Sequence, residues 1–134
     1  MPSNFATNPG EAMETIPFNL AVVAGHLSRP AEARELGSGA KLVALELTVP
    51  REGAPAESVP VVWHEAPAWA STLSVGEEVI VIGRVRRRFF RAGGTTQSRT
   101  EVLADQVVLS SWARRRREAL GKAEVRLREL SQEG

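Results

Sequence analysis

Short segments in which apolar and polar residues alternate are spread between positions 18 and 110 of the chain. In Leu42–Val49 the odd-numbered positions are all Val or Leu, whereas Ala, Glu and Thr fill positions 44, 46 and 48. A period of two is the pattern of a β-strand that buries one of its faces. Strands are therefore predicted for residues 18–27, 42–49, 59–64, 79–90 and 99–109.

Turn-forming residues separate these segments, among them Gly37-Ser38-Gly39 and the stretch from Ala92 to Thr96. Residues 67–73 favour a short helix between the third and fourth strands, because Pro67 would stand at its first turn, where a proline loses no hydrogen bond. Five short strands with one small helix in this place predict an all-β fold over residues 18–110, the five-stranded Greek-key barrel called the OB-fold.

Two segments with other patterns flank the predicted barrel. Residues 1–17 contain Pro and Gly and show no period, which indicates a flexible N-terminal arm. Residues 111–134 change to a helical period, with a seam formed by Ala113, Arg116, Leu120, Ala123, Leu127 and Leu130. This basic C-terminal helix either pairs with a partner helix or is marginally stable, because Arg116 and Gly121 interrupt the seam.

Composition excludes several classes of protein. The 134 residues include no cysteine, which excludes disulfides, thiolate metal sites and thiol nucleophiles. The longest apolar run, Leu20 to Ala24, is too short for a membrane span and no secretory signal follows Met1, so a cytoplasmic protein without membrane partners is expected. The two histidines have no metal-ligand spacing, and neither a phosphate-binding loop nor a G-x-S-x-G motif occurs. We therefore expect no enzymatic activity, no metal and no cofactor.

The net charge of +1 conceals a strong asymmetry. Residues 1–83 carry 4 basic and 10 acidic side chains, whereas residues 84–134 carry 13 basic and 6 acidic ones. Of the seventeen basic residues, fifteen are arginines, whose planar guanidinium suits bidentate contact with phosphate and stacking on rings. A GC-rich genome, whose codons favour Arg, explains the excess equally well.

The strand predicted at residues 79–90 carries the most informative pattern. Residues two apart share a face of a strand, so four side chains should project together: Arg84, Arg86, Arg88 and Phe90. Val81 and Val85 should point to the core on the other side. A row of cations that ends in an aromatic ring is typical of single-stranded nucleic acid binding, because cations follow the phosphates and bases stack on the ring. The alternative is a solvated edge strand whose charges prevent aggregation.

Further binding residues are predicted near this row: Arg91, Arg99, Trp63 and His64. Arg99 would lie across the hairpin from the arginines and extend the basic surface. Trp63 and His64 end the third strand, where either ring could face a base; the alternatives are burial of Trp63 in the core and an ordinary surface position for His64. The side chains of Arg114–Arg117 would point in different directions around a helix. Such a run either binds phosphate or, more commonly, forms a solvated helix start.

Three motifs in this order resemble those of bacterial single-stranded DNA-binding proteins. They are Asn19–Leu27 followed by Arg29–Arg34 and Ser38-Gly39, then Val75–Arg86, and then Thr100–Asp105. The resemblance covers roughly residues 18–110. It implies an OB-fold, binding of single-stranded DNA with little sequence preference, and a homo-oligomer, either a tetramer or a dimer. It also implies that Phe90 takes the place of a base-stacking aromatic, with Arg84, Arg86 and Arg88 on the family's basic strand.

The sequence departs from that family in two places. Residues 41–58 contain no aromatic where family members carry one, and His64 stands near another aromatic position, so a lower affinity is expected. The sequence ends in Glu129 to Gly134 after a basic helix, where family members carry an acidic tip, so recruitment of repair enzymes through such a tip is not expected.

Three functions are compatible with these patterns. The first is sequence-tolerant binding of single-stranded DNA, which would protect or organise it in replication, repair or recombination. The second is an OB-fold that serves as a protein-interaction or replication-restart module with weak nucleic-acid binding. The third is an RNA-binding OB domain. Nothing in the arginine row separates DNA from RNA.

Overall fold

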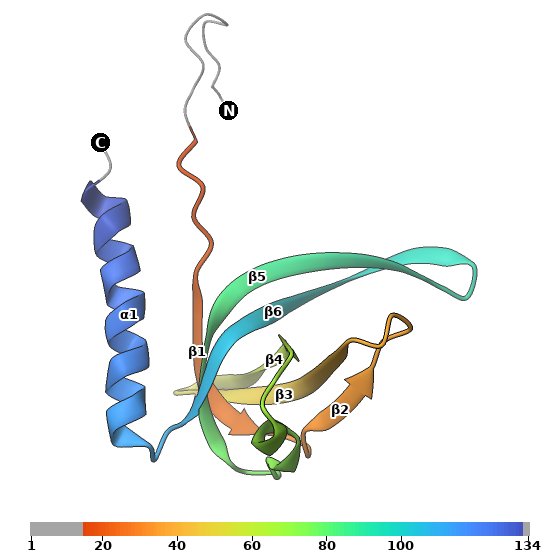
Figure 1. Ribbon diagram of the computed structural model, residues 1–134, viewed down its shortest axis with the longest axis horizontal. Helices are drawn as coiled ribbons and strands as arrows, with labels where there is room; N and C mark the ends of the chain where they lie inside the picture. Colours follow the sequence, from red (N-terminus) through yellow and green to blue (C-terminus); the bar gives the residue numbers. More distant parts are fainter. Residues whose placement is uncertain (1–14, 133–134) are drawn as a thin grey trace, which may run out of the picture.

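The computed structural model describes residues 15–132, which form a β-barrel, a long β-hairpin that extends from it and a C-terminal helix (Figure 1). In chain order the elements are β1 (Ala21–Leu27), β2 (Glu32–Glu35), β3 (Lys41–Arg51), β4 (Ala54–His64), η1 (Ala68–Thr72), β5 (Glu78–Ala92), β6 (Thr95–Leu109) and α1 (Ala113–Gln132). The five principal strands confirm the predicted barrel. The predicted arm lies outside the described residues except for positions 15–17, which have no regular secondary structure.

The barrel closes because β1 pairs with two strands. It runs antiparallel to β5 along most of its length, and its last residues also pair with β3, where Leu27 lies opposite Leu47. A Cβ atom on Gly25 would lie 2.4 Å from the carbonyl oxygen of Thr48, so this junction requires a glycine. The parallel pair of β4 and β6 completes the barrel.

Alternate residues of the strands fill the barrel interior. Val43, Leu45 and Leu47 of β3 are buried as predicted, which confirms the period-two interpretation of this strand. The other strands contribute Leu27, Val61, Val79, Val81, Val102 and Val107 to the same core.

Trp63 also lies in this core, with 8% of its surface exposed. A ring enclosed by barrel side chains cannot stack on a base, so the prediction that Trp63 binds nucleic acid is wrong. Its ring instead begins an edge-to-face series that runs from the core to the start of α1. The centroids of Trp63 and Trp69 are 5.6 Å apart, and those of Trp69 and Trp112 are 5.2 Å apart.

Besides shifted ends, such as that of β6, which begins at Thr95 rather than at position 99, three elements differ most from the sequence prediction. β2 was not predicted, because its residues are all exposed and carry no apolar period. β4 begins at Ala54 rather than at position 59, since this polar, proline-containing stretch pairs with β3 as the second arm of a hairpin. The helix predicted over residues 67–73 is only the 3-10 turn η1, in which the N–H of Ala70 donates to the carbonyl of Pro67 at 2.9 Å. Such short runs commonly adopt the tighter 3-10 geometry.

Helix α1 packs on the outer face of β5 and β6 where these strands belong to the barrel. Ala119 and Ala123 are buried there, and their small side chains let the helix approach the sheet closely. They pack against Ile80, Ile82 and Val108. Among residues 15–132, no helix is both long and apolar enough to cross a membrane.

The predicted helical seam is not the stripe that α1 buries. Of its members only Ala123 is buried, whereas Leu120 and Leu127 are 38% and 50% exposed. The helix packs on a sheet through small residues one turn apart, and its second half extends past the buried positions. A periodic pattern locates such a helix but does not show which of its sides packs against the sheet.

The β5–β6 hairpin extends well beyond the barrel (Figure 1). Its turn is Gly93-Gly94, and both glycines have positive φ (60° and 82°), as a tight two-residue hairpin turn requires. This turn sets a register in which Arg86 lies opposite Glu101 and Arg88 opposite Arg99. A bulge beside Gly83 marks the point where the hairpin leaves the barrel.

The hairpin has two faces with different side chains. We call the side that continues the barrel exterior the front face; on β5 it carries Arg84, Arg86, Arg88 and Phe90. The reverse face carries Val85, Arg87, Phe89 and Arg91. Val85 shares the side of the buried Val81 but is 46% exposed, because β5 has no β1 neighbour beyond Gly83. The prediction that Val85 points into the core is therefore wrong.

Candidate nucleic-acid interface

The front face brings the predicted arginine row together. Arg84, Arg86 and Arg88 alternate along β5, and Arg99 joins them from β6 opposite Arg88. The side chains of these four arginines are between 36% and 55% exposed. They are therefore accessible from solvent on one surface, as the alternation predicts.

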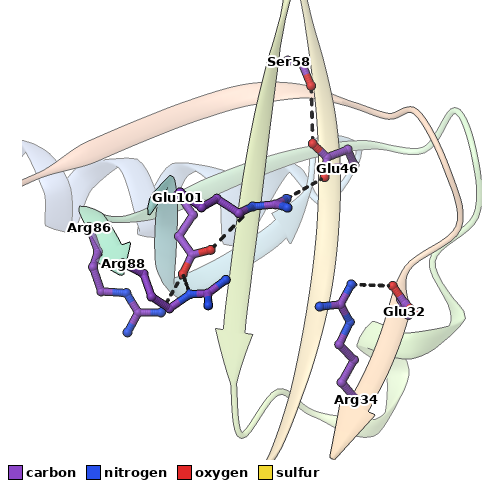
Figure 2. Close-up of polar contacts among 8 residues, drawn as sticks. Glu32, Arg34, Glu46, Ser58, Arg86, Arg88 and Glu101 are labelled. Carbon is purple, nitrogen blue, oxygen red and sulfur yellow. Dashed lines mark hydrogen bonds and ion pairs between the residues drawn. The ribbon is translucent and has the colours of Figure 1, made fainter. Parts of the chain in front are cut away.

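A carboxylate that the sequence did not single out lies in the middle of these arginines (Figure 2). Glu101 is 2% exposed. Its Oε2 accepts hydrogen bonds from Arg86 Nη2 at 2.6 Å and from Arg88 Nε at 3.2 Å, and its Oε1 lies 3.9 Å from Arg99 Nε. Burial alone would raise the pKa of Glu101, but the hydrogen bonds and charges of Arg86 and Arg88 hold that pKa below its usual value. The ionised carboxylate thus anchors two members of the row.

Other carboxylates offset the remaining front-face arginines. Arg99 Nη2 donates to Glu46 Oε1 at 3.3 Å, and Glu46 Oε2 accepts a hydrogen bond from the Ser58 hydroxyl (Figure 2). Arg84 Nη1 lies 3.9 Å from Asp105 Oδ1. A phosphate that binds here has to share guanidinium groups that carboxylates already contact.

A groove crosses the front face beside the hairpin. It consists of two adjoining hollows of about 260 and 320 Å³ that share Arg34, Val62, Arg88 and Glu101. His64 lies exposed at the end of β4 and lines the second hollow together with Arg86. The groove therefore runs from the β2 side of the barrel to the arginine row.

Phe90 lies at the distal end of the row. The Arg88 guanidinium lies over its ring, 5.0 Å from the centroid, while Arg88 Nε donates to Glu101. Carboxylate, guanidinium and ring form one connected unit. Both the ring and the guanidinium plane are surfaces on which a nucleobase can stack.

Six of the eight predicted binding residues lie along the groove or the front face: Arg84, Arg86, Arg88, Phe90, Arg99 and His64. Arg91 lies on the reverse face, where its Nη2 donates to the Gly94 carbonyl at 2.7 Å and supports the turn. Trp63 is in the core. Contact between any of these residues and nucleic acid stays a prediction.

Sequence reasoning missed Glu101 and Glu46 as parts of this surface. A signal for Glu101 was present, since a two-residue turn at Gly93-Gly94 pairs positions 86 and 101 and puts both side chains on one face. Glu46 had no such signal, because its approach to Arg99 depends on how β3 and the hairpin meet in space. Within residues 15–132, no cluster of three or more His, Asp or Glu side chains could hold a metal ion.

Comparison with known proteins shows which family and which structures the chain is similar to. Residues 18–110 match the model of the single-strand binding protein family. The wild-type single-stranded DNA binding protein from Thermus aquaticus is 26% identical, with a TM-score of 0.57 over 69% of this chain and 40% of that chain. A deletion mutant of the same protein is 27% identical over the same shares, with a TM-score of 0.57.

The fold also matches a structure of Plasmodium falciparum SSB in complex with ssDNA, at 15% identity and a TM-score of 0.60 over 72% of this chain and 98% of that chain. With 40% of each Thermus aquaticus chain covered, this chain spans less than half the length of that protein. No match was found among curated protein sequences.

Proposed function

Since the chain belongs to the single-strand binding protein family, we propose that it binds single-stranded DNA through the front face, with little sequence preference and without catalysis. The observation that carries this proposal is that Arg86, Arg88, Arg99 and His64 line one groove. Arg84 and Phe90 continue the row on the same face of the hairpin. Phosphates would contact the guanidinium groups while a base stacks on Phe90. Such binding would protect or organise exposed strands during replication, repair or recombination.

Glu101 fixes the positions of two arginines of this surface for DNA binding. It holds Arg86 and Arg88 in place before DNA arrives, so fewer side-chain conformations are lost on binding. Arg88 uses only Nε for Glu101 and keeps its terminal nitrogens for a phosphate. The same carboxylate reduces the net positive charge, which limits affinity and its dependence on salt.

We also propose that the protein forms a homo-oligomer, a dimer or a tetramer, through β1. This strand pairs with β3 only at His26 and Leu27, which leaves residues 21–25 with an open edge. Val22 in this stretch is 46% exposed. An open strand edge with an exposed apolar residue favours pairing with another strand.

The test of DNA binding is a fluorescence-anisotropy titration with labelled oligo-dT of about 10 nucleotides, a length within the range of about 4–16 that one OB domain covers. We expect binding that weakens with salt and that duplex DNA does not compete. Phe90→Ala should weaken it about 5- to 150-fold, the equivalent of one lost stacked base. Phe89→Ala is the matched control, because Phe89 is the neighbouring ring on the reverse face.

The arginines are tested by the double substitution of Arg86 and Arg88 with alanine. If both contact phosphates, the slope of log affinity against log salt should flatten by about 1.4. Unfolding of this variant is measured in parallel, because it leaves the buried Glu101 with only the long ion pair to Arg99. No binding of the wild-type protein at low salt would refute the proposed function and favour an OB-fold that acts as a protein-interaction module.

A further inference from the structure

The reverse face of the hairpin presents apolar and basic side chains to solvent. Phe89 is 64% exposed, more than any other large apolar residue described, and Val85 is 46% exposed. Arg87 lies between them on the same side of β5, and Arg91 follows. Across the hairpin this face carries hydroxyl groups, since Arg87 lies opposite Thr100 and Phe89 opposite Ser98.

This face repeats the chemistry of the front face. The Arg87 guanidinium lies 5.5 Å from the centroid of Phe89, as Arg88 lies 5.0 Å from that of Phe90. Arg87 Nε also donates to the Ser98 hydroxyl at 3.3 Å, which orients the guanidinium beside the ring. Two cation–aromatic pairs therefore stand back to back on adjacent residues of one strand.

The two faces differ in how their charge is offset. Each front-face arginine lies within 4 Å of a carboxylate of Asp105, Glu101 or Glu46. Among the described residues, no carboxylate lies within that distance of Arg87 or Arg91. The hairpin arginines whose charge is not offset are thus those on the reverse face.

We propose that the reverse face is a second contact surface for the same DNA strand, with Phe89 stacking on a base and Arg87 contacting a phosphate. This inference rests on the proposed function. A polyanion with flat rings satisfies both the unneutralised charge and the exposed ring. A second copy that met this face with its own reverse face would bring like charge against it, which disfavours a symmetric contact there.

The hairpin allows a strand to reach both faces. It extends beyond the barrel, and none of the helices and strands within residues 15–132 covers either face near the tip (Figure 1). The turn consists of Gly93 and Gly94, and nothing within 4 Å surrounds the position that a side chain would take at either residue. A DNA strand bound to the front face can therefore pass over this bare tip and continue on the reverse face.

The experiment compares labelled oligo-dT of about 10 and about 35 nucleotides on wild type, Phe89→Ala, Arg87→Ala and Phe90→Ala. The shorter strand should depend on Phe90 and not on Phe89. The longer strand should bind about 5-fold or more weakly to Phe89→Ala, because one stacked base is lost. Arg87→Ala should flatten the salt slope of the longer strand by about 0.7, as expected for one phosphate contact.

A second measurement does not depend on any variant. Oligo-dT of about 35 nucleotides with iodinated bases is photocrosslinked to the wild-type protein, and the linked residues are mapped by mass spectrometry. Crosslinks at both Phe89 and Phe90 support two contact surfaces.

Unchanged binding of the longer strand to Phe89→Ala and Arg87→Ala, with crosslinks only at Phe90, overturns the inference while the proposed function stands. A changed molecular mass of Phe89→Ala with unchanged DNA binding also overturns it and makes the reverse face a protein contact. If wild type binds neither strand, the proposed function itself has failed.

Discussion

Glu101 makes a dense group of arginines compatible with a stable fold. Its oxygens lie 2.6, 3.2 and 3.9 Å from nitrogens of Arg86, Arg88 and Arg99. Without an anion among them, the three positively charged guanidinium groups would repel one another and the side chains would separate. The carboxylate is buried and the guanidinium groups are partly exposed, so the negative charge stays inside while the positive groups remain accessible from outside.

Replacing Glu101 with Gln should lower the free energy of unfolding at neutral pH by about 1–3 kcal/mol, since hydrogen bonds to charged groups contribute about that much. The pKa of Glu101 is lowered in the folded state, so the ionised carboxylate stabilises the fold above the ordinary value of 4.5. That contribution is lost as pH falls through the lower folded value. Urea unfolding of wild type and variant over a pH series should therefore show a gap that closes in acid.

Glu118→Gln is the control for this measurement, because Glu118 forms an exposed i,i+4 pair with Arg114 on α1. Exposed pairs contribute little, so its effect should stay below about 0.5 kcal/mol. A gap between wild type and Glu101→Gln that persists unchanged into strong acid would show that the ion pairs do not provide the stability.

At the scale of elements, the transition from barrel to hairpin depends on one close backbone contact. A Cβ on Gly83 would lie 1.9 Å from the carbonyl oxygen of Leu103, beside the bulge where β6 gains an extra residue. The bulge lets β5 continue in one direction while its partner changes register. The front-face arginines owe their common direction to the regular pairing that resumes beyond this point.

Gly83→Ala should therefore destabilise the protein by about 1–3 kcal/mol or more, because backbone atoms must move to admit the methyl group. Gly37→Ala is a matched control, since a Cβ at Gly37 would meet nothing within 4 Å. Thermal unfolding of the two variants checks this difference. Equal stability of both would mean that the strands can separate at the bulge without penalty.

At the scale of the whole molecule, the sequence predicted what depends on local periodicity. The alternation in β3 and β5 located the barrel strands and grouped the front-face arginines. What it did not predict depends on where distant segments meet. Val85 follows the core pattern but lies beyond Gly83, the β5 residue that pairs with the first residue of β1. Trp63 is enclosed by strands whose positions cannot be predicted from a local pattern. Which side of α1 is buried likewise depends on its packing against β5 and β6 and not on the helical pattern alone.

The oligomer proposed through β1 is tested by light scattering after size-exclusion chromatography. Wild type should elute as a multiple of the monomer mass, and Val22→Asp should reduce that mass, because a charge at the strand edge opposes pairing. Val125→Asp, a similarly exposed position on α1, should leave it unchanged. A monomeric wild type, or an unchanged mass for Val22→Asp, would contradict the proposed interface.

The edge-to-face series of Trp63, Trp69 and Trp112 has an optical consequence. These three rings are all the tryptophans of the chain, and they connect the barrel core with the start of α1. None lies on the front or the reverse face of the hairpin. Intrinsic emission should therefore stay almost constant while DNA is added and change when α1 detaches or the core opens. Tryptophan fluorescence should therefore report whether the protein is folded, and not whether DNA is bound.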